Sequence, residues 1–420
     1  MASRYPRFNQ LLSNTDGSVT ILFTFCTTIL LLSLVVSADY ARAIFVSQKV
    51  TNALDAAALA GAKLLDADGA NDSDVKTRAH NFFNAEIQKI GGPKVILATM
   101  DPSVQRSSNT VTTQVQATVK TYFGGFVGIP DIKMNKTSTV SYKMRKIELS
   151  MALDITGSML EVPPADTQTK MESLKVSSKN LVDALFARST NDSNIRIALA
   201  PYSASINPGP YVASVTSGAA NTGCVVERSG TNNTTDALAS GGDALVPMPD
   251  PTMCPASAVM PLAGRSEQNN IKSFIDSFTA YGGTAGHLGT AWAWYMISPT
   301  WNSMFSGNSK PESYSPDVIK SVVIMTDGVF NTSYMGGYAS NTQPAVDESY
   351  AQFIGLCTAM KAKGVAVYTV LFGLVDPTAE AKMMACASSP GNYYLASNGT
   401  QLQASFQQIA DKLNNLRITN

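Results

Sequence analysis

Hydrophobic positions follow three different patterns along this chain of 420 residues, and the first pattern is an unbroken apolar run. Residues 18–38 contain no charged side chain, and neither Gly nor Pro occurs from there until Gly61. About 20 apolar residues span the hydrocarbon core of a bilayer, so we expect a transmembrane helix at 18–38 that continues outward as a helical stalk. Arg4 and Arg7 precede the run, which predicts that residues 1–17 stay in the cytoplasm.

A removable signal peptide is the alternative to this anchor. Val36-Ser37-Ala38 is similar to a signal-peptidase cleavage site. The apolar run is long for a signal peptide, however, and we favour an uncleaved single-pass anchor. The bulk of the chain then lies on the far side of the membrane from the N-terminus.

The second pattern extends over residues 39–146, after the transmembrane segment, and consists of shorter apolar runs beyond the stalk. Asp72–Ile90 has helical spacing, whereas residues 111–119 alternate apolar and polar side chains with the period of a half-buried strand. Thr137–Lys143 is a second strand candidate. We therefore expect a small α+β module packed on the stalk, whose function the sequence does not indicate.

In the third pattern, from Ile147 onward, strands and helices alternate. A strand with a period of two begins at Ile147, and apolar helical faces recur to the end of a terminal helix. This alternation predicts an α/β fold with a doubly wound, mostly parallel sheet over residues 147–418. Residues 203–264 are rich in Gly, Asn, Ser and Pro and lack periodicity, so we expect an insertion there that is either functional or filler.

Oxygen-bearing side chains follow the first strand of this α/β region directly. Asp154 ends the strand, and Thr156 and Ser158 share the loop after it. Thr284 lies in a later Gly-rich loop, and Asp327 ends a second buried strand. Ligand sites of open α/β sheets lie at the carboxyl ends of the strands, and Mg²⁺ takes oxygen ligands in octahedral geometry. The five residues together are a candidate metal site.

This set of residues, in this order, resembles the metal-ion-dependent adhesion site of von Willebrand factor A domains. The family pattern is Asp-x-Ser/Thr-x-Ser, a later Thr, and a later Thr/Ser-Asp-Gly. The resemblance implies that Thr156, Ser158 and Thr284 coordinate Mg²⁺, or alternatively Mn²⁺ or Ca²⁺, while Asp154 and Asp327 act mainly through bound water. It also implies one open coordination position that accepts an acidic residue of a protein partner.

Two other interpretations of the Asp154 loop remain open. An Asp at the end of a strand, followed by Thr and Gly, also forms a simple turn or a helix cap. A phospho-aspartate phosphatase likewise has an Asp at the end of a hydrophobic strand. Those enzymes usually carry a second Asp two residues later, and here that position is Thr156.

Three segments near the N-terminus, Asp16–Phe23, Asp39–Ala43 and Asn52–Ala60, resemble TadE/TadG-like proteins of the bacterial tight-adherence (Tad, Flp pilus) system. Pseudopilins of this system carry a Glu five residues after the cleavage Gly, whereas Leu22 stands five residues after Gly17. This difference favours a TadG-type protein, and the combination with an A-domain-like region is itself TadG-like. An ordinary signal anchor with an Ala-rich stalk is the alternative.

Composition narrows the choice of function. The formal net charge is zero and only 15% of the residues are charged, and no basic patch with interleaved aromatics is present, so we expect no nucleic-acid partner. The two histidines, His80 and His287, are far apart in sequence, which argues against a His-rich zinc site; we expect His287 to be a polar loop residue. Because no Ser-His-Asp or Cys-His arrangement is visible, we predict that the protein is not an enzyme.

Four of the five cysteines lie in the A-domain-like region, and Cys26 lies in the apolar run. Cys224 and Cys254 flank one polar segment, and Cys357 and Cys386 flank another. Disulfides are expected in an exported region, and four cysteines allow three connectivities. We prefer Cys224–Cys254 and Cys357–Cys386 because each closes a local loop, with four buried free thiols as the alternative.

These features predict a membrane-anchored assembly or anchoring component of a Tad-type pilus. We place it in the bacterial inner membrane, with a cytoplasmic N-terminus and a periplasmic main body. Its partners are expected to be pilus or secretion-machinery proteins that offer an acidic residue to the metal site. The alternative is a cell-envelope adhesin or sensor that uses the same site without a pilus role.

Overall fold

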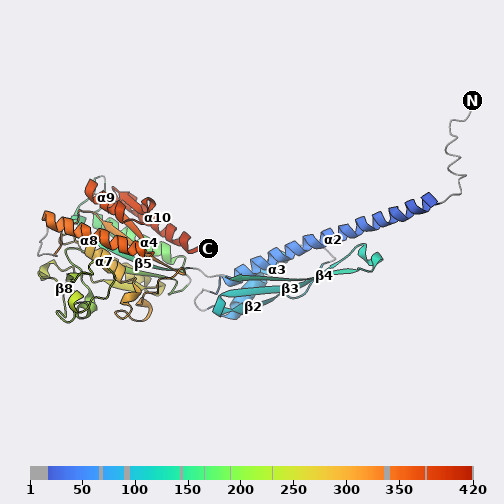
Figure 1. Cartoon of the computed structure of the whole chain (residues 1–420), viewed down its shortest axis with the longest axis horizontal. Helices are drawn as coiled ribbons and strands as arrows, with labels where there is room; N and C mark the ends of the chain where they lie inside the picture. Colours follow the sequence, from blue (N-terminus) through green and yellow to red (C-terminus); the bar gives the residue numbers. More distant parts are fainter. Residues whose placement is uncertain are drawn as a thin grey trace, which may run out of the picture. The chain divides into compact units, whose positions relative to one another are not determined.

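The computed structural model describes residues 18–65, 70–88, 95–141, 145–164, 166–189, 191–228, 230–334, 341–373 and 376–418. The predicted cytoplasmic segment 1–17 lies outside them. The chain divides into two compact units, Met1–Lys143 and Met144–Asn420, which are drawn in Figure 1. Each unit has its own hydrophobic core.

The first unit is built on one continuous helix, α2 (Ser18–Ala62). Its first half exposes a row of large apolar side chains, namely Val19, Ile21, Leu22, Phe23, Phe25, Ile29, Leu30, Leu31, Leu32 and Leu34. Within the described ranges, α2 is the one helix long and apolar enough to cross a membrane. The expected apolar helix is thus present and fits a single-pass anchor.

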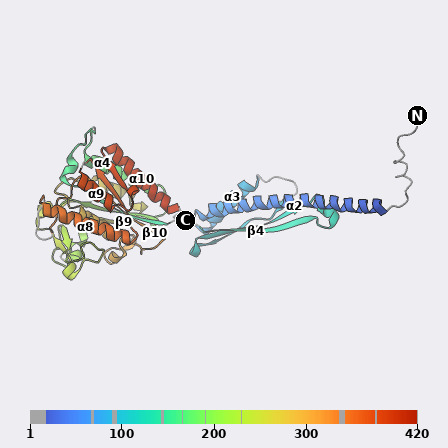
Figure 2. The same ribbon diagram turned by 45° about the horizontal axis from the view of Figure 1, so that its top comes forward.

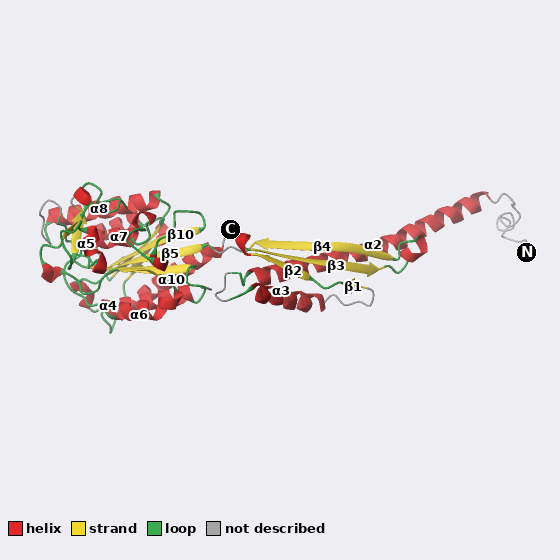
Figure 3. Cartoon of the chain, turned by 90° about the horizontal axis from the view of Figure 1, so that it is seen from below, coloured by secondary structure: helices red, strands yellow, loops and turns green. Residues whose placement is uncertain are grey.

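The second half of α2 packs against a helix and an antiparallel sheet. The helix is α3 (Asp72–Ile87), and the strands are β1 (Val95–Leu97), β2 (Asp101–Gln105), β3 (Thr110–Lys120) and β4 (Asp131–Ser141). Figure 3 shows β3 and β4 running alongside α2. Small residues of α2 such as Ala53 and Ala57 are buried in this core, which lets the helix lie close to the strands. Strand β4 begins six residues earlier than the expected Thr137.

The second unit contains a six-stranded, mostly parallel sheet in the order β12-β11-β10-β5-β6-β9. The strands are β5 (Lys146–Asp154), β6 (Ile195–Tyr202), β9 (Met260–Ala263), β10 (Val318–Thr326), β11 (Ala366–Phe372) and β12 (Tyr393–Ala396). Only β9 is antiparallel to its neighbour. The expected mixed α/β fold with parallel strands is therefore present.

Two hydrophobic clusters cover the two faces of this sheet. One includes side chains of α4 (Lys170–Phe186), α6 (Gln268–Asp276) and α10 (Gly399–Ile418). The other includes side chains of α7 (Gly286–Tyr295), α8 (Gln343–Ala362) and α9 (Pro377–Cys386). Figure 2 shows α4 and α10 on one side of the strands and α8 on the other.

The predicted insertion has more regular structure than its sequence suggests. It contains the short helix α5 (Val212–Val215) and the antiparallel pair β7 (Val225–Arg228) and β8 (Leu245–Pro247). Its last residues form β9 and extend the main sheet, so the expected insertion boundary at 264 includes an edge strand. Pro261 interrupts the apolar pattern there and hides the strand in the sequence.

Both preferred disulfides are present. Cys224–Cys254 joins the residue before β7 to the segment between β8 and β9, and Cys357–Cys386 joins α8 to α9. Cys26 is a free thiol on the exposed half of α2.

Candidate functional site

The predicted site loops meet at the carboxyl ends of β5 and β10, which are neighbours in the parallel sheet. The amide of Gly157 donates to the carbonyl of Gly282 at 3.0 Å, which joins the loop after β5 to the Gly-rich loop before α7. The Ser158 hydroxyl donates to Oδ1 of Asp327 at 2.7 Å, which joins it to the end of β10. Three segments that are far apart in sequence thus share one edge of the sheet.

Asp154 is fully buried and is held by hydroxyl and amide groups. Its Oδ1 accepts hydrogen bonds from the amide of Thr156 at 2.9 Å and from the Thr156 hydroxyl at 2.6 Å. Its Oδ2 accepts from the hydroxyl of Thr326 at 2.8 Å and, at 3.4 Å, from that of Tyr202. Among the described residues, no Lys, Arg or His forms an ion pair with Asp154. Burial and the nearby charge of Asp327 therefore raise the pKa of Asp154 to about 7.

Asp327 contacts a cation through only one of its two carboxylate oxygens. Its Oδ2 accepts a hydrogen bond from Nζ of Lys170 at 2.9 Å, and the same Nζ contacts Glu161 at 2.8 Å. Burial raises the pKa of Asp327, and although Lys170 and Ser158 act in the opposite direction, the net shift is upward. Lys170 is itself buried, whereas the side chain of Glu161 is 68% exposed. The site thus holds two buried carboxylates and one buried ammonium group.

Hydrogen bonds of its backbone amide and carbonyl hold Thr284 in position. Its amide donates to the Asn331 side-chain oxygen at 2.8 Å, and its carbonyl accepts from the Asn331 amide at 3.0 Å. A Cβ atom added to Gly328 would lie 3.8 Å from the Thr284 hydroxyl and 3.7 Å from that of Ser158. The Thr156 and Ser158 hydroxyls are 3.1 Å apart. All five predicted residues therefore lie together, and glycine at 328 keeps side-chain atoms away from two of their hydroxyls.

Several contributors to the site are not among the predicted residues. Thr326 is part of the Thr-Asp-Gly pattern, and Tyr202 ends β6 beside Asp154 in the parallel register; both positions carry a signal in the sequence. Ser203, the next residue, is buried, and its hydroxyl has no hydrogen-bond partner. It lies 3.5 Å from a Cβ placed on Gly282. Lys170, on α4, has no sequence signal that marks it.

The insertion reaches this neighbourhood through Glu227 on β7. Its Oε1 accepts from the Ser333 hydroxyl at 2.9 Å and from the Tyr334 amide at 2.8 Å, in the loop that also carries Asn331. His287 contacts the same oxygen at 2.9 Å through Nε2 and Ser349 at 2.7 Å through Nδ1. His287 is buried on α7, so the expectation of a loop residue is wrong.

Ser349, His287 and Glu227 form a Ser-His-Glu series that the sequence does not reveal. The Ser349 hydroxyl is fully buried, and the cavity beside His287 has a volume of only about 10 Å³, which is the size of one water molecule. Burial raises the pKa of Glu227, but its contacts with His287 and the hydrogen bond from the Tyr334 amide together act in the opposite direction, and the net shift is downward. The series joins the insertion to α7 and α8 and leaves no space for a substrate.

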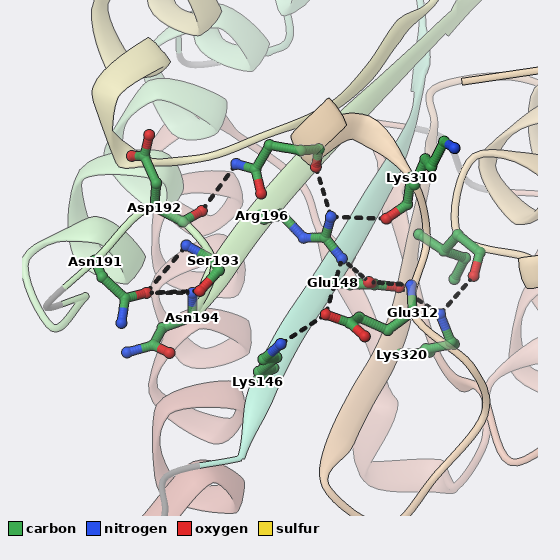
Figure 4. A network of polar contacts seen from close by, with 12 residues as sticks. Lys146, Glu148, Asn191, Asp192, Ser193, Asn194, Arg196, Lys310, Glu312 and Lys320 are labelled. Atoms are coloured by element: carbon green, nitrogen blue, oxygen red, sulfur yellow. Dashed lines mark hydrogen bonds and ion pairs between the residues drawn. The ribbon is translucent and has the colours of Figure 1, made fainter. Parts of the chain in front are cut away.

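A second polar cluster lies at the opposite end of the sheet and is drawn in Figure 4. Glu148 accepts from Arg196 through one oxygen and from Lys320 through the other. The three residues occupy matched positions on β6, β5 and β10. The amide of Glu312 adds a hydrogen bond to Glu148 at 2.7 Å, and Lys146 pairs with Glu312 at 2.6 Å.

Comparison with known proteins gives a family for the N-terminal segment. Residues 17–64 match the Flp pilus-assembly TadE/G-like family, so the chain carries a TadE/G-like domain at its N-terminus. This segment coincides with α2 and the residues just after it. None of the curated proteins matches the chain.

Solved structures similar to this chain include pilus adhesins and tip proteins. The von Willebrand factor domain of the type V pilus tip protein Mfa5 from Porphyromonas gingivalis has 12% sequence identity and a TM-score of 0.42, covering 66% of this chain and 98% of that one. The pilus adhesin SpaC from Lactobacillus rhamnosus GG has 12% identity and a TM-score of 0.38 over 77% of this chain. This chain spans 35% of the length of SpaC. The tip pilin GBS104 of Group B Streptococcus agalactiae has 13% identity and a TM-score of 0.37, covering 64% of this chain and all of that one.

Proposed function

We propose that this protein is a membrane-anchored assembly or anchoring component of a Tad-type pilus, and that its second unit captures protein partners through a divalent cation. α2 anchors it in the bacterial inner membrane, with residues 1–17 in the cytoplasm and the chain beyond the apolar stretch 18–38 in the periplasm. The TadE/G-like N-terminal segment favours a pilus role over that of an adhesin or sensor unrelated to pili. The protein acts by binding and not by catalysis.

The observation that carries the binding mechanism is the shortage of positive charge at the carboxyl ends of β5 and β10. Asp154 and Asp327 are both buried, and Lys170 balances only one of them. Burying a charge without a partner costs free energy, so an unpaired buried carboxylate at this position indicates a function. A divalent cation supplies the missing charge.

The side chains present fit a hard cation. Every group that faces the site from the five predicted residues is a carboxylate or a hydroxyl oxygen, which is the donor set of Mg²⁺, Ca²⁺ and Mn²⁺. The unpartnered hydroxyl of Ser203 beside Gly282 adds one more oxygen at this edge. Thr156, Ser158 and Thr284 would hold the ion directly, and Asp154 and Asp327 would hold it mainly through water. The bound ion would supply an open position for a partner's Asp or Glu.

Titration calorimetry of Mg²⁺ and Mn²⁺ into the detergent-solubilised full chain tests the site. Asp154→Asn keeps the size of the side chain and removes its charge, so we expect it to abolish binding. Asp276→Asn, which changes a half-exposed carboxylate on α6, is the matched control and should bind as the wild type does. Equal binding by the wild type and by Asp154→Asn would refute the site.

Partner capture provides the second readout. We expect pilus components retained by the immobilised wild-type chain to be released by a chelator, to return with Mg²⁺, and to be absent with Asp154→Asn. Capture that survives both the chelator and the mutation would contradict a metal-bridged mechanism even if the metal itself binds.

A further inference from the structure

The loop between β3 and β4 exposes an unusual concentration of large apolar side chains. We call residues 121–130 the aromatic loop; it contains no charged residue. Its exposed large side chains are Tyr122, Phe123, Phe126, Val127 and Ile129. Phe126 is 85% exposed. Contiguous apolar patches of this kind on a protein surface mark contact with a partner or a membrane.

The aromatic loop is fixed to α2 by Asp39, the first charged residue after the apolar stretch 18–38. The Asp39 carboxylate is buried and accepts hydrogen bonds from three consecutive backbone amides, those of Tyr122 at 2.9 Å, Phe123 at 2.8 Å and Gly124 at 2.9 Å. One turn further along α2, Arg42 donates to the carbonyl of Lys120 at 3.0 Å and lies 4.8 Å from the centre of the Tyr122 ring.

The loop is also closed on itself, so its shape is set before it meets any partner. The Thr121 hydroxyl donates to the carbonyls of Ile129 at 2.7 Å and Pro130 at 3.0 Å. A Cβ atom on Gly124 would lie 2.5 Å from the Ile129 carbonyl oxygen, so only glycine permits this closure. The apolar side chains are held outward on a rigid turn.

The length of the apolar stretch 18–38 indicates how far the aromatic loop lies from the centre of the membrane. The 21 residues from 18 to 38 make a helix of roughly 32 Å at 1.5 Å per residue, which matches a hydrocarbon core of about 30 Å. Asp39 then lies at the membrane surface, and its hydrogen bonds hold the aromatic loop at the same level. Figure 1 shows the β3–β4 tip beside α2, with the helix continuing past it.

We propose that the aromatic loop inserts into the headgroup region of the membrane that α2 spans, on the side where the stalk emerges. Aromatic residues are favoured at this depth because they combine an apolar ring with tolerance of the wet interface. Lys120 and Lys133, on the strands just above the loop, are placed to meet lipid phosphates. α2 and the loop make a two-point contact that fixes the tilt of the stalk. The inference depends on α2 spanning a membrane and not on the metal site.

A fluorescent probe at residue 126 tests this placement in the full chain. In a Cys26→Ser background, Phe126→Cys is labelled with an environment-sensitive fluorophore and the protein is reconstituted into phosphatidylcholine–phosphatidylglycerol vesicles. Lipids that carry a nitroxide near the headgroup should quench the probe by about twofold, as expected for interfacial burial, and aqueous iodide should quench it weakly. Ser141→Cys, at the opposite end of the β3–β4 ladder and roughly 30 Å away, is the control and should show the reverse.

Two outcomes would overturn the proposal. A probe at 126 that iodide quenches as strongly as the probe at 141 would place the loop in water. A probe shielded from iodide but insensitive to the nitroxide lipid would place it against protein. Retention of the protein in vesicles after an alkaline wash tests the anchor separately, so failure of the anchor and failure of the loop are distinguishable.

Asp39 is a positioning residue in this proposal. Asp39→Ala should release the loop from α2 and lower the lipid quenching at residue 126 toward the control value while the protein stays in the vesicles. Asp55→Ala, which removes an exposed carboxylate further along α2, should leave the quenching unchanged. Equal quenching in both variants would show that Asp39 does not place the loop.

Discussion

β5 carries a buried carboxylate near each end, and the two have opposite surroundings. Glu148, near the amino end, lies between Arg196 and Lys320 on the neighbouring strands, and both of its oxygens contact a cation. Asp154, at the carboxyl end, is surrounded by the hydroxyl groups of three side chains and by a second carboxylate. Both carboxylates are fully buried, so the difference lies in their partners and not in their exposure.

This difference is the basis for proposing a ligand site at the Asp154 end and a structural cluster at the Glu148 end. The row of Lys320, Glu148 and Arg196 contains its own counter-charges, and the carbonyl of Ile297 accepts a further hydrogen bond from Lys320 at 2.7 Å. The Asp154 end lacks one positive charge. Burial with an unbalanced charge at the ligand-binding edge of a sheet is what a binding site for a cation requires.

The largest expected effect comes from removing the Glu148 carboxylate from the row at the amino end of β5, which we call the balanced end. Glu148→Gln would leave Arg196 and Lys320 buried with only the partly exposed Glu312, 3.9 Å from Arg196, as a counter-charge, and we expect a loss of about 3–5 kcal/mol in the free energy of unfolding. Glu312→Gln removes a partly exposed partner of Lys146 and should cost less than about 1 kcal/mol. Denaturant unfolding of both variants measures the difference. Similar losses in the two variants would mean that Glu148 is not essential to the row.

The unbalanced end should make the metal-free protein lose stability as pH rises. The pKa of Asp154 is raised from 3.8 to about 7 in the folded chain, so between these values the folded state holds a proton that the unfolded state has released. Stability from this group is therefore highest below about pH 4 and falls as pH rises to about 7, by at most about 4 kcal/mol.

Comparison with Asp154→Asn isolates this titration. Relative to that variant, the wild type in chelator should lose stability as the pH rises from about 4 to about 7. Addition of Mg²⁺ at pH 8 should restore the stability that the wild type has lost. A pH profile parallel to that of Asp154→Asn would show that Asp154 titrates normally.

Steric closure of the site should reduce metal affinity and spare stability. In Gly328→Val, the branched side chain would extend from a Cβ position 3.7–3.8 Å from the Ser158 and Thr284 hydroxyls. We expect Mg²⁺ to bind at least about tenfold more weakly, a difference of roughly 1.4 kcal/mol. Gly328→Ala should bind almost normally, because its Cβ makes only ordinary contacts. Unchanged Mg²⁺ affinity in Gly328→Val would exclude the ion from this side of the site.

Much of the fold could be predicted because long patterns have few interpretations. A charge-free run of 21 residues predicts α2, and alternating strands and helices predict a parallel sheet. The predicted strand begins too late because only Ile132 and Met134 are apolar among residues 131–136 and both are only half-buried, which makes a weak alternating pattern. The sequence gives no sign that His287 is buried, because its partners, Glu227 and Ser349, come from distant segments.

The two ends of β5 differ in how far the sequence reveals them. The carboxyl-end residues follow strands directly, so the topology of a parallel sheet brings Asp154 and Asp327 together. At the other end, three strands each place a charged residue directly after an Ile, at Glu148, Arg196 and Lys320. That repeated signal is visible in the sequence, but only the register of the strands shows that the charges meet.

The smallest expected effect comes from Lys170, because its ammonium group offsets part of the negative charge of Asp154 and Asp327. Its Nζ lies 2.9 Å from Asp327, and like charges repel an incoming cation. Lys170→Met keeps most of the side-chain volume and should raise Mg²⁺ affinity by about threefold to tenfold, while the metal-free protein becomes less stable. Lys179→Met, which changes a lysine of α4 that pairs with Asp276 instead, should alter neither property. If Lys170→Met bound Mg²⁺ more weakly, Lys170 would belong to the binding arrangement itself, and the charge deficit at Asp154 would not be the reason that the site binds a cation.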